Sequence, residues 1–314
     1  MPQTPPEMSD RTPRDTLGRR STLVHSRRAW LGIAALSPLA LKAGAGPVSV
    51  VYRSGSEAFA DAVEALKKRI ESGGCVCHLL DLAGSGERIR NAPCQLMVAM
   101  GGEALEKAAQ AKQSTATIAS MALRSEIDRR SGGLNLVGRM MLDIPINQIA
   151  AEVIAVLGAK TRLALIRNPH SQNMVDSVPV RNGSLQIVDC AKAEDLLPRF
   201  LSLRSKVDAV IAAPDATLYN SATVKPLILA SLENRLPVIG FSTSFVRAGA
   251  AIGIYPDFRE VGKQTGDLAI RTLAGESLKD ETPRRLVVGV NPQVVRLLGL
   301  NMKEPRSSEL VVVK

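Results

Sequence analysis

The sequence predicts an α/β protein with two doubly wound parallel-sheet lobes that face a central cleft. Short runs rich in Val, Ile and Leu alternate with segments of helical periodicity, a pattern typical of parallel strands joined by crossover helices. The alternation occurs twice along the 314 residues. Because single cores stop growing at about 250–300 residues, a chain of this length favours two lobes over one.

The first 45 residues precede this alternation and have the layout of an export signal. Basic residues lead to the segment 26–31 (SRRAWL), a short apolar stretch follows, and Ala43, Gly44 and Ala45 supply small residues for cleavage. The apolar stretch is shorter than the roughly 20 residues that a spanning helix needs. The arginine pair is similar to a twin-arginine signal, and the general export route is the alternative. We expect cleavage after about Ala45 and a soluble periplasmic protein.

Residues 46–145 are predicted to form most of the first lobe. The helix expected at 57–70 carries apolar side chains at helical spacing, among them Ala62, Leu66 and Ile70. The strands expected here are 48–52, 76–80, 95–99, 116–119 and 136–139, and a second helix is expected at 102–111.

Residues 146–282 are predicted to form the second lobe, starting with a helix at 146–157 that follows Pro145 and ends at Gly158. Its expected strands are 163–167, 185–189, 209–213, 238–241 and 251–255, and its expected helices are 193–203, 222–234 and 258–274. Residues 283–300, with a strand at 285–290 and a helix at 292–298, are expected to rejoin the first lobe's sheet. The tail, residues 301–314, could add an edge strand at 310–313.

The residues expected in an active site are largely missing from the sequence. Beyond the signal segment the only histidines are His78 and His170, too few for a histidine metal site. No phosphate-binding glycine loop occurs, and Gly240 to Ser244 breaks the nucleophile-elbow pattern at its last position. Residues 1–45 hold +4 of the net charge of +10, and the remaining +6 favours solubility and mild attraction to anions. We therefore expect no enzyme, no cofactor and no metal, with an enzyme of unknown type as a weaker alternative.

The four cysteines are expected to be buried, unpaired thiols. Cys75 and Cys77 are two residues apart in a strand-like run, too far apart to bridge well, whereas Cys94 and Cys190 belong to different strands. No cysteine lies at the predicted cleavage site, so lipid attachment has no acceptor there.

Polar residues at the carboxyl ends of the predicted strands are the candidate ligand contacts, because ligands of open α/β sheets bind beyond those ends. Asp215 could hold an ammonium group, or could equally be a turn aspartate. Ser56 could contact ligand, cap the helix that follows, or do both. The candidates in the first lobe are Ser54, Ser56, Gly101 and Ser120, and those in the second are Asn168, Asp215, Ser242 and Phe245.

Three segments of the second lobe carry a resemblance to a known family: 208–220 (DAVIAAPDATLYN), 234–242 (NRLPVIGFS) and 245–250 (FVRAGA). They are similar to the tryptophan/tyrosine-type substrate-binding proteins of ABC transporters, over roughly residues 205–300. The resemblance implies the type I periplasmic-binding-protein fold, with Asp215 in the loop for the ligand's amino group and Ser242 and Phe245 in the facing loop. Residues 168–184 depart from the family because they lack the periodicity of its crossover helix.

These observations predict a solute-binding protein that captures a small ligand, such as an amino acid or a related metabolite, for an ABC permease in the inner membrane. A periplasmic sensor that presents its ligand state to a membrane receptor or kinase is the alternative. A regulator of the lactose-repressor type is excluded by layout, because residues 1–25 contain four prolines and no helix-turn-helix pattern.

Overall fold

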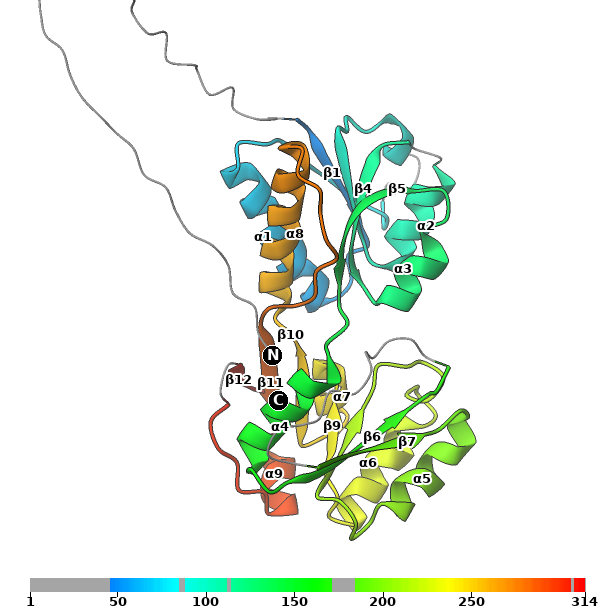
Figure 1. Ribbon diagram of the computed structural model, residues 1–314, viewed down its shortest axis with the longest axis vertical. Helices are drawn as coiled ribbons and strands as arrows, with labels where there is room; N and C mark the ends of the chain where they lie inside the picture. Colours follow the sequence, from blue (N-terminus) through cyan, green and yellow to red (C-terminus); the bar gives the residue numbers. More distant parts are fainter. Residues whose placement is uncertain (1–45, 85–87, 112–113, 171–183, 306–307, 314) are drawn as a thin grey trace, which may run out of the picture. The chain divides into compact units, whose positions relative to one another are not determined.

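The computed structural model describes residues 46–84, 88–111, 114–170, 184–305 and 308–313. These residues form two α/β lobes, each built on a mainly parallel sheet (Figure 1), and all of them belong to one unit, Lys42–Lys314. The predicted signal segment, residues 1–45, and residues 171–183 of the aperiodic stretch lie outside the described residues.

The first sheet has five parallel strands in the order β2-β1-β3-β4-β5. The strands are β1 (Val48–Tyr52), β2 (Cys77–Asp81), β3 (Leu96–Met100), β4 (Ala116–Ala122) and β5 (Asn135–Met141). Helices α1 (Glu57–Ser72) and α8 (Phe258–Leu273) lie side by side on one face, whereas α2 (Gly102–Gln110) and α3 (Arg124–Arg130) cover the other (Figure 1). A short 3₁₀ helix, η1 (Arg88–Asn91), precedes β3.

The second sheet has seven strands in the order β12-β11-β10-β9-β8-β6-β7. The strands are β6 (Arg162–Arg167), β7 (Ser184–Asp189), β8 (Ala209–Ala212), β9 (Val238–Gly240), β10 (Ile252–Pro256), β11 (Leu286–Val290) and β12 (Glu309–Val312). One face packs on α4 (Ile146–Leu157) and α9 (Pro292–Leu298). The other packs on α5 (Leu196–Ser202), which follows η2 (Ala193–Asp195), and on α6 (Val224–Glu233) and α7 (Thr243–Arg247).

Strand residues alternate between the two helical layers, which explains how short apolar runs build two cores per sheet. In β1, Val48 and Val50 are buried against α1 and α8, while Val51 is buried against the α2 side. Both faces of the sheet are therefore covered, as the unbroken Val-Ile-Leu runs predict for parallel strands. Helix starts follow local chemistry too: the Asp257 carboxylate accepts the Arg259 and Glu260 amides at the start of α8.

The predicted place of residues 283–300 is wrong. β11 pairs antiparallel with β10, with Ile252 opposite Val290 and Pro256 opposite Leu286, so these residues extend the second sheet. β12 then pairs parallel with β11, which confirms the edge strand expected in the tail. Just before this segment, Glu281 forms an isolated bridge with Met140 of the first sheet.

The helix expected at 258–274 belongs to the first lobe and not to the second. Val261, Leu268 and Ala269 of α8 are buried in the same cluster as β1 and β3. Gly262 lies so close to α1 that a Cβ there would be 2.1 Å from the Ala62 carbonyl oxygen. The chain therefore passes between the lobes three times, before α4, before α8 and after α8.

Candidate functional site

Ser54 lies at the carboxyl end of β1, in a polar rim of the first sheet. Its amide donates to the Asp81 carboxylate at 3.1 Å, and the Ala83 amide donates to the same oxygen at 3.0 Å. Hydrogen bonds from Ser54 and Ala83 hold the pKa of Asp81 below its ordinary value. Beside them the Arg53 guanidinium forms two hydrogen bonds with the Glu103 carboxylate. The rim at the carboxyl end of β1 therefore carries positive and negative side chains, the Arg53 guanidinium and the Asp81 and Glu103 carboxylates.

Ser56 and Gly101 begin the two helices that follow β1 and β3. The Ser56 hydroxyl accepts the Phe59 amide at 3.3 Å and so caps α1. Gly101 has φ of +86°, and a Cβ there would be 2.8 Å from the Phe59 ring. Because that conformation and that contact both require glycine, Gly101 shapes the rim through its backbone.

Ser120 was expected among the ligand contacts, and the structure contradicts that expectation. Its side chain is fully buried, and its hydroxyl oxygen is 2.7 Å from the Thr265 hydroxyl oxygen of α8. Ser120 lies two residues after Ile118, which packs in the α1 and α8 core, and residues two apart in a strand share a face. The side chain thus points into the first lobe.

Asp215 follows β8 and forms a turn. One carboxylate oxygen accepts the amides of Thr217 at 2.8 Å and Leu218 at 3.1 Å, as expected for a turn aspartate. The other oxygen accepts no hydrogen bond from the described residues. The half-buried carboxylate therefore serves the turn and keeps one oxygen for a further partner.

Asn168 follows β6 and is nearly buried. Its side-chain oxygen accepts the His170 amide at 3.0 Å, which turns the chain as β6 ends. Next to it, Arg167 pairs with Asp189 of β7 at 3.1 Å. This edge of the second sheet is therefore charged, like the rim around Arg53.

Phe245 is 4 % exposed and does not offer its ring to a ligand. It packs against Gly240, where a Cβ would be 2.8 Å away, and its centroid is 5.2 Å from that of Phe241. Phe241 follows β9, is half-buried, and also contacts Tyr219 edge to face. Phe241 is the aromatic residue at the strand end that sequence reasoning missed. The signal was available, since Phe241 follows an apolar strand directly while Phe245 lies one helical turn later.

Ser242 caps α7 by accepting the Phe245 amide at 3.2 Å. Ser242 and Ser56 are the two predicted site residues that line a common cavity, of about 710 Å³, which we name the β10–α8 cavity. The other six predicted residues do not line it. Its wall residues are Ser56 to Ala58, Asp61, Ser242 to Ser244, Arg247, Tyr255 to Arg259, Val287, Glu309 and Val311 to Val313.

The described residues contain no group of three His, Cys, Asp or Glu side chains that could hold a metal ion. Within the same ranges, no helix has the length and apolar character to cross a bilayer. Cys75 and Cys190 are buried, whereas Cys77 and Cys94 are half-buried and not fully buried as expected. Burial raises the pKa of Cys77 to about 11, so its thiol is a poor nucleophile.

Comparison with solved structures shows the fold. The chain resembles the ligand-free, open structure of CD0873, a substrate binding protein with adhesive properties from Clostridium difficile. The TM-score is 0.62 at 14% identity, and the match covers 86% of this chain and 100% of that one. It also resembles an ABC domain in complex with L-Trp from Streptococcus pneumonia, with a TM-score of 0.51, 12% identity, and coverage of 85% and 99%. The third is a conserved domain protein from Vibrio cholerae, with a TM-score of 0.52, 16% identity, and coverage of 84% of this chain and 99% of that one. The fold is that of the type I periplasmic binding proteins.

The family comparison is more specific. Residues 172–306 match the model of the ABC transporter substrate binding protein family, which supports the resemblance to substrate-binding proteins of ABC transporters in general. No curated protein sequence matches the chain significantly.

Proposed function

We propose that the protein is exported and binds a small ligand at the carboxyl-end loops of its two sheets, for delivery to an ABC permease. The observation that carries the proposal is the joint occurrence of this two-lobed fold and the family match over residues 172–306. Substrate-binding proteins of this fold place ligand beyond the carboxyl ends of parallel strands, and there the present chain has its polar rims.

The residues available for the ligand are those with a polar group or an aromatic face that is not already engaged in contacts within the protein. In the second lobe these are the second carboxylate oxygen of Asp215 and the partly exposed ring of Phe241. In the first lobe the Arg53 guanidinium and the Ser54 amide are already paired, with Glu103 and Asp81, so a ligand there shares or displaces these partners. A carboxylate, a guanidinium and an aromatic face suit a zwitterion with an apolar part, such as an amino acid.

A thermal-stability screen of the protein with amino acids and related metabolites tests the proposal. A ligand that binds only the folded state raises the melting temperature by mass action. For a ligand found in this way, Asp215→Asn keeps the oxygen that accepts the Thr217 and Leu218 amides and removes the charge.

We expect the dissociation constant of an amino-group ligand to rise about 10- to 150-fold in Asp215→Asn, since a charge-assisted hydrogen bond contributes about 1.5–3 kcal/mol. Glu194→Gln, at an exposed acid near the start of α5, is the matched control and should leave the affinity unchanged. An affinity of Asp215→Asn within about twofold of the parent would make Asp215 a turn residue only.

A further inference from the structure

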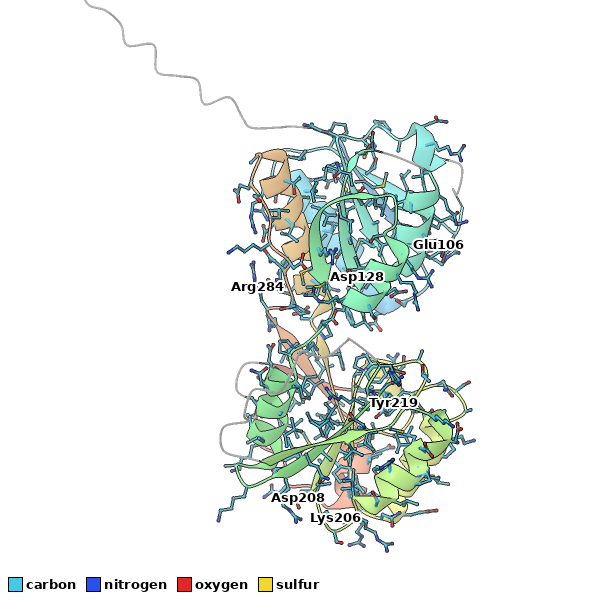
Figure 2. The ribbon with its side chains drawn as sticks, turned by 45° about the vertical axis from the view of Figure 1, so that its right-hand side comes forward. Glu106, Asp128, Lys206, Asp208, Tyr219 and Arg284 are labelled. Atoms are coloured by element: carbon cyan, nitrogen blue, oxygen red, sulfur yellow. The ribbon has the colours of Figure 1, made fainter. Side chains whose placement is uncertain are left out.

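Tyr255 has an unusual environment among the walls of the β10–α8 cavity. The residue is only 6 % exposed, and its hydroxyl forms no hydrogen bond with the described residues. The buried Tyr219 provides the contrast, because its hydroxyl donates to the Ile166 carbonyl at 3.0 Å (Tyr219 is labelled in Figure 2). The Tyr255 hydroxyl is therefore available to a polar group that enters the cavity, which Tyr255 lines.

Two glycines, which have no side chain, leave room for neighbouring groups at the floor of this cavity. Gly253 of β10 and Gly289 of β11 are paired across the sheet. A Cβ at Gly289 would be 2.7 Å from the Tyr255 hydroxyl oxygen, and one at Gly253 would be 2.5 Å from Val246 of α7. The Tyr255 ring therefore lies over Gly289 while α7 lies on Gly253. Valines 287, 311 and 313 complete an apolar floor.

The walls carry more negative than positive charge. Four carboxylates, those of Glu57, Asp61, Asp257 and Glu309, face two guanidiniums, those of Arg247 and Arg259. Arg285, outside the walls, pairs with Glu309 at 3.2 Å and with Asp257 at 3.6 Å, and a surplus of one negative charge remains.

The carboxylates differ in how firmly the fold holds them. Asp61 pairs with Arg259 at 2.6 Å, and Asp257 caps α8. Glu57 is 81 % exposed and reaches Arg247 only at 3.8 Å, and Glu309 is also exposed. Glu57 and Glu309 are therefore the acids that can turn to a ligand.

An aromatic pair adds a second attraction for a cation. The rings of Tyr255 and Phe258 are stacked, with centroids 6.5 Å apart and planes 14° apart, and both residues line the cavity. The negative face of an aromatic ring attracts ammonium groups. A volume of about 710 Å³ is in the range of small-molecule sites.

We propose that the β10–α8 cavity is a second ligand site, for a small molecule with a primary ammonium group on an apolar body. The ammonium donates hydrogen bonds to the Tyr255 hydroxyl and to the Glu309 carboxylate, and the apolar body lies on the valine floor. The site does not depend on Asp215, which does not line the cavity, although two of the predicted ligand contacts, Ser56 and Ser242, do.

Three molecules of one shape test the charge preference by calorimetry on the full chain: 3,3-dimethylbutylamine, 3,3-dimethyl-1-butanol and 3,3-dimethylbutanoate. We expect the amine to bind at least about tenfold more tightly than the alcohol, because its hydrogen bonds are charge-assisted. The carboxylate should bind most weakly. Equal affinity for the three, tighter binding of the carboxylate, or no binding of the amine overturns the proposal.

Variants then locate the site. Tyr255→Phe keeps the ring and should weaken amine binding about three- to tenfold without lowering the melting temperature, and Glu309→Gln should weaken it as well. Tyr219→Phe is the matched control, since it removes a hydroxyl with a core partner. It should lower the melting temperature and leave amine binding unchanged.

Asp215→Asn separates the two sites. Amine affinity that is unchanged in Asp215→Asn and reduced in Tyr255→Phe supports the cavity. The reverse result assigns the amine to the Asp215 site, which overturns the second site and leaves the proposed function intact.

Discussion

The hydroxyl oxygens of Ser120 and Thr265 are 2.7 Å apart inside the first lobe and join β4 to α8, although 145 residues separate them in sequence. Thr265 also donates to the Val261 carbonyl of its own helix at 2.8 Å, so the Ser120 hydroxyl donates to Thr265. This pair attaches α8, which follows β10 of the second sheet in the sequence, to the first sheet.

Thr265→Val is expected to lower the free energy of unfolding by about 1–3 kcal/mol, because it preserves side-chain volume and leaves the buried Ser120 hydroxyl without its acceptor. Urea denaturation measures the change. Ser120→Ala should cost less, since Thr265 keeps the Val261 carbonyl. A Thr265→Val protein as stable as the parent would show that the contact contributes nothing to the attachment of α8.

The same pair shows where sequence reasoning ended. Most strands and helices lie within about two residues of their predicted bounds, because each depends on local periodicity and caps. The helices Ile146–Leu157 and Pro292–Leu298 have the predicted bounds. Which lobe receives α8 depends on partners more than 100 residues away, such as the α1 backbone that Gly262 approaches, and the sheet of β11 depends on its pairing with β10. Neither periodicity nor composition encodes that choice.

Three short helices were also missed, α3, α7 and η1, each of seven residues or fewer. α7 explains the error at Phe245. The residue was predicted in an open loop after β9, whereas a single helical turn capped by Ser242 turns its ring into the core. The candidate rim was predictable from strand ends, but the direction of each side chain depends on the pleat and on such turns.

Export is tested by mass spectrometry of the periplasmic fraction of cells that express the chain. We expect an N-terminus at Gly46, because the basic segment, the apolar stretch and Ala43 to Ala45 occur in the order of a cleavable signal. Replacing Arg27 and Arg28 by lysine should block export if the twin-arginine route is used. An intact N-terminus in the membrane fraction would refute cleavage.

Thiol titration tests the cysteines. Denatured, unreduced protein should react at four thiols, and the native protein should react slowly at pH 8. Burial raises the pKa of Cys77 to about 11, which leaves about one thiolate in a thousand at that pH, and burial also raises the pKa of Cys94. Two or fewer thiols in the denatured protein would reveal a disulfide.

Asp143 lies between β5 and α4, where the chain first passes from one lobe to the other, and it is 7 % exposed. Its carboxylate accepts the Arg124 amide at 2.6 Å, and burial raises the pKa of this carboxyl above its ordinary value. Arg124, which pairs with Asp280 at 3.6 Å, opposes the rise, and Asp128 adds to it.

For an acid whose folded-state pKa is raised, the protonated form stabilises the fold. Its contribution is complete below the unfolded pKa, about 3.9 for aspartate, and is lost as the pH rises through the folded pKa. Asp143→Asn keeps an oxygen for the Arg124 amide and removes the charge. We therefore expect the variant to gain melting temperature relative to the parent between pH 4 and pH 7, with the gain growing as the pH rises. Asp189→Asn, at an exposed acid paired with Arg167 and not among the groups that shift the pKa of Asp143, is the control and should not show this gain. A melting temperature of Asp143→Asn that falls relative to the parent as the pH rises would mean that the ionised carboxylate, through Arg124, stabilises this crossing.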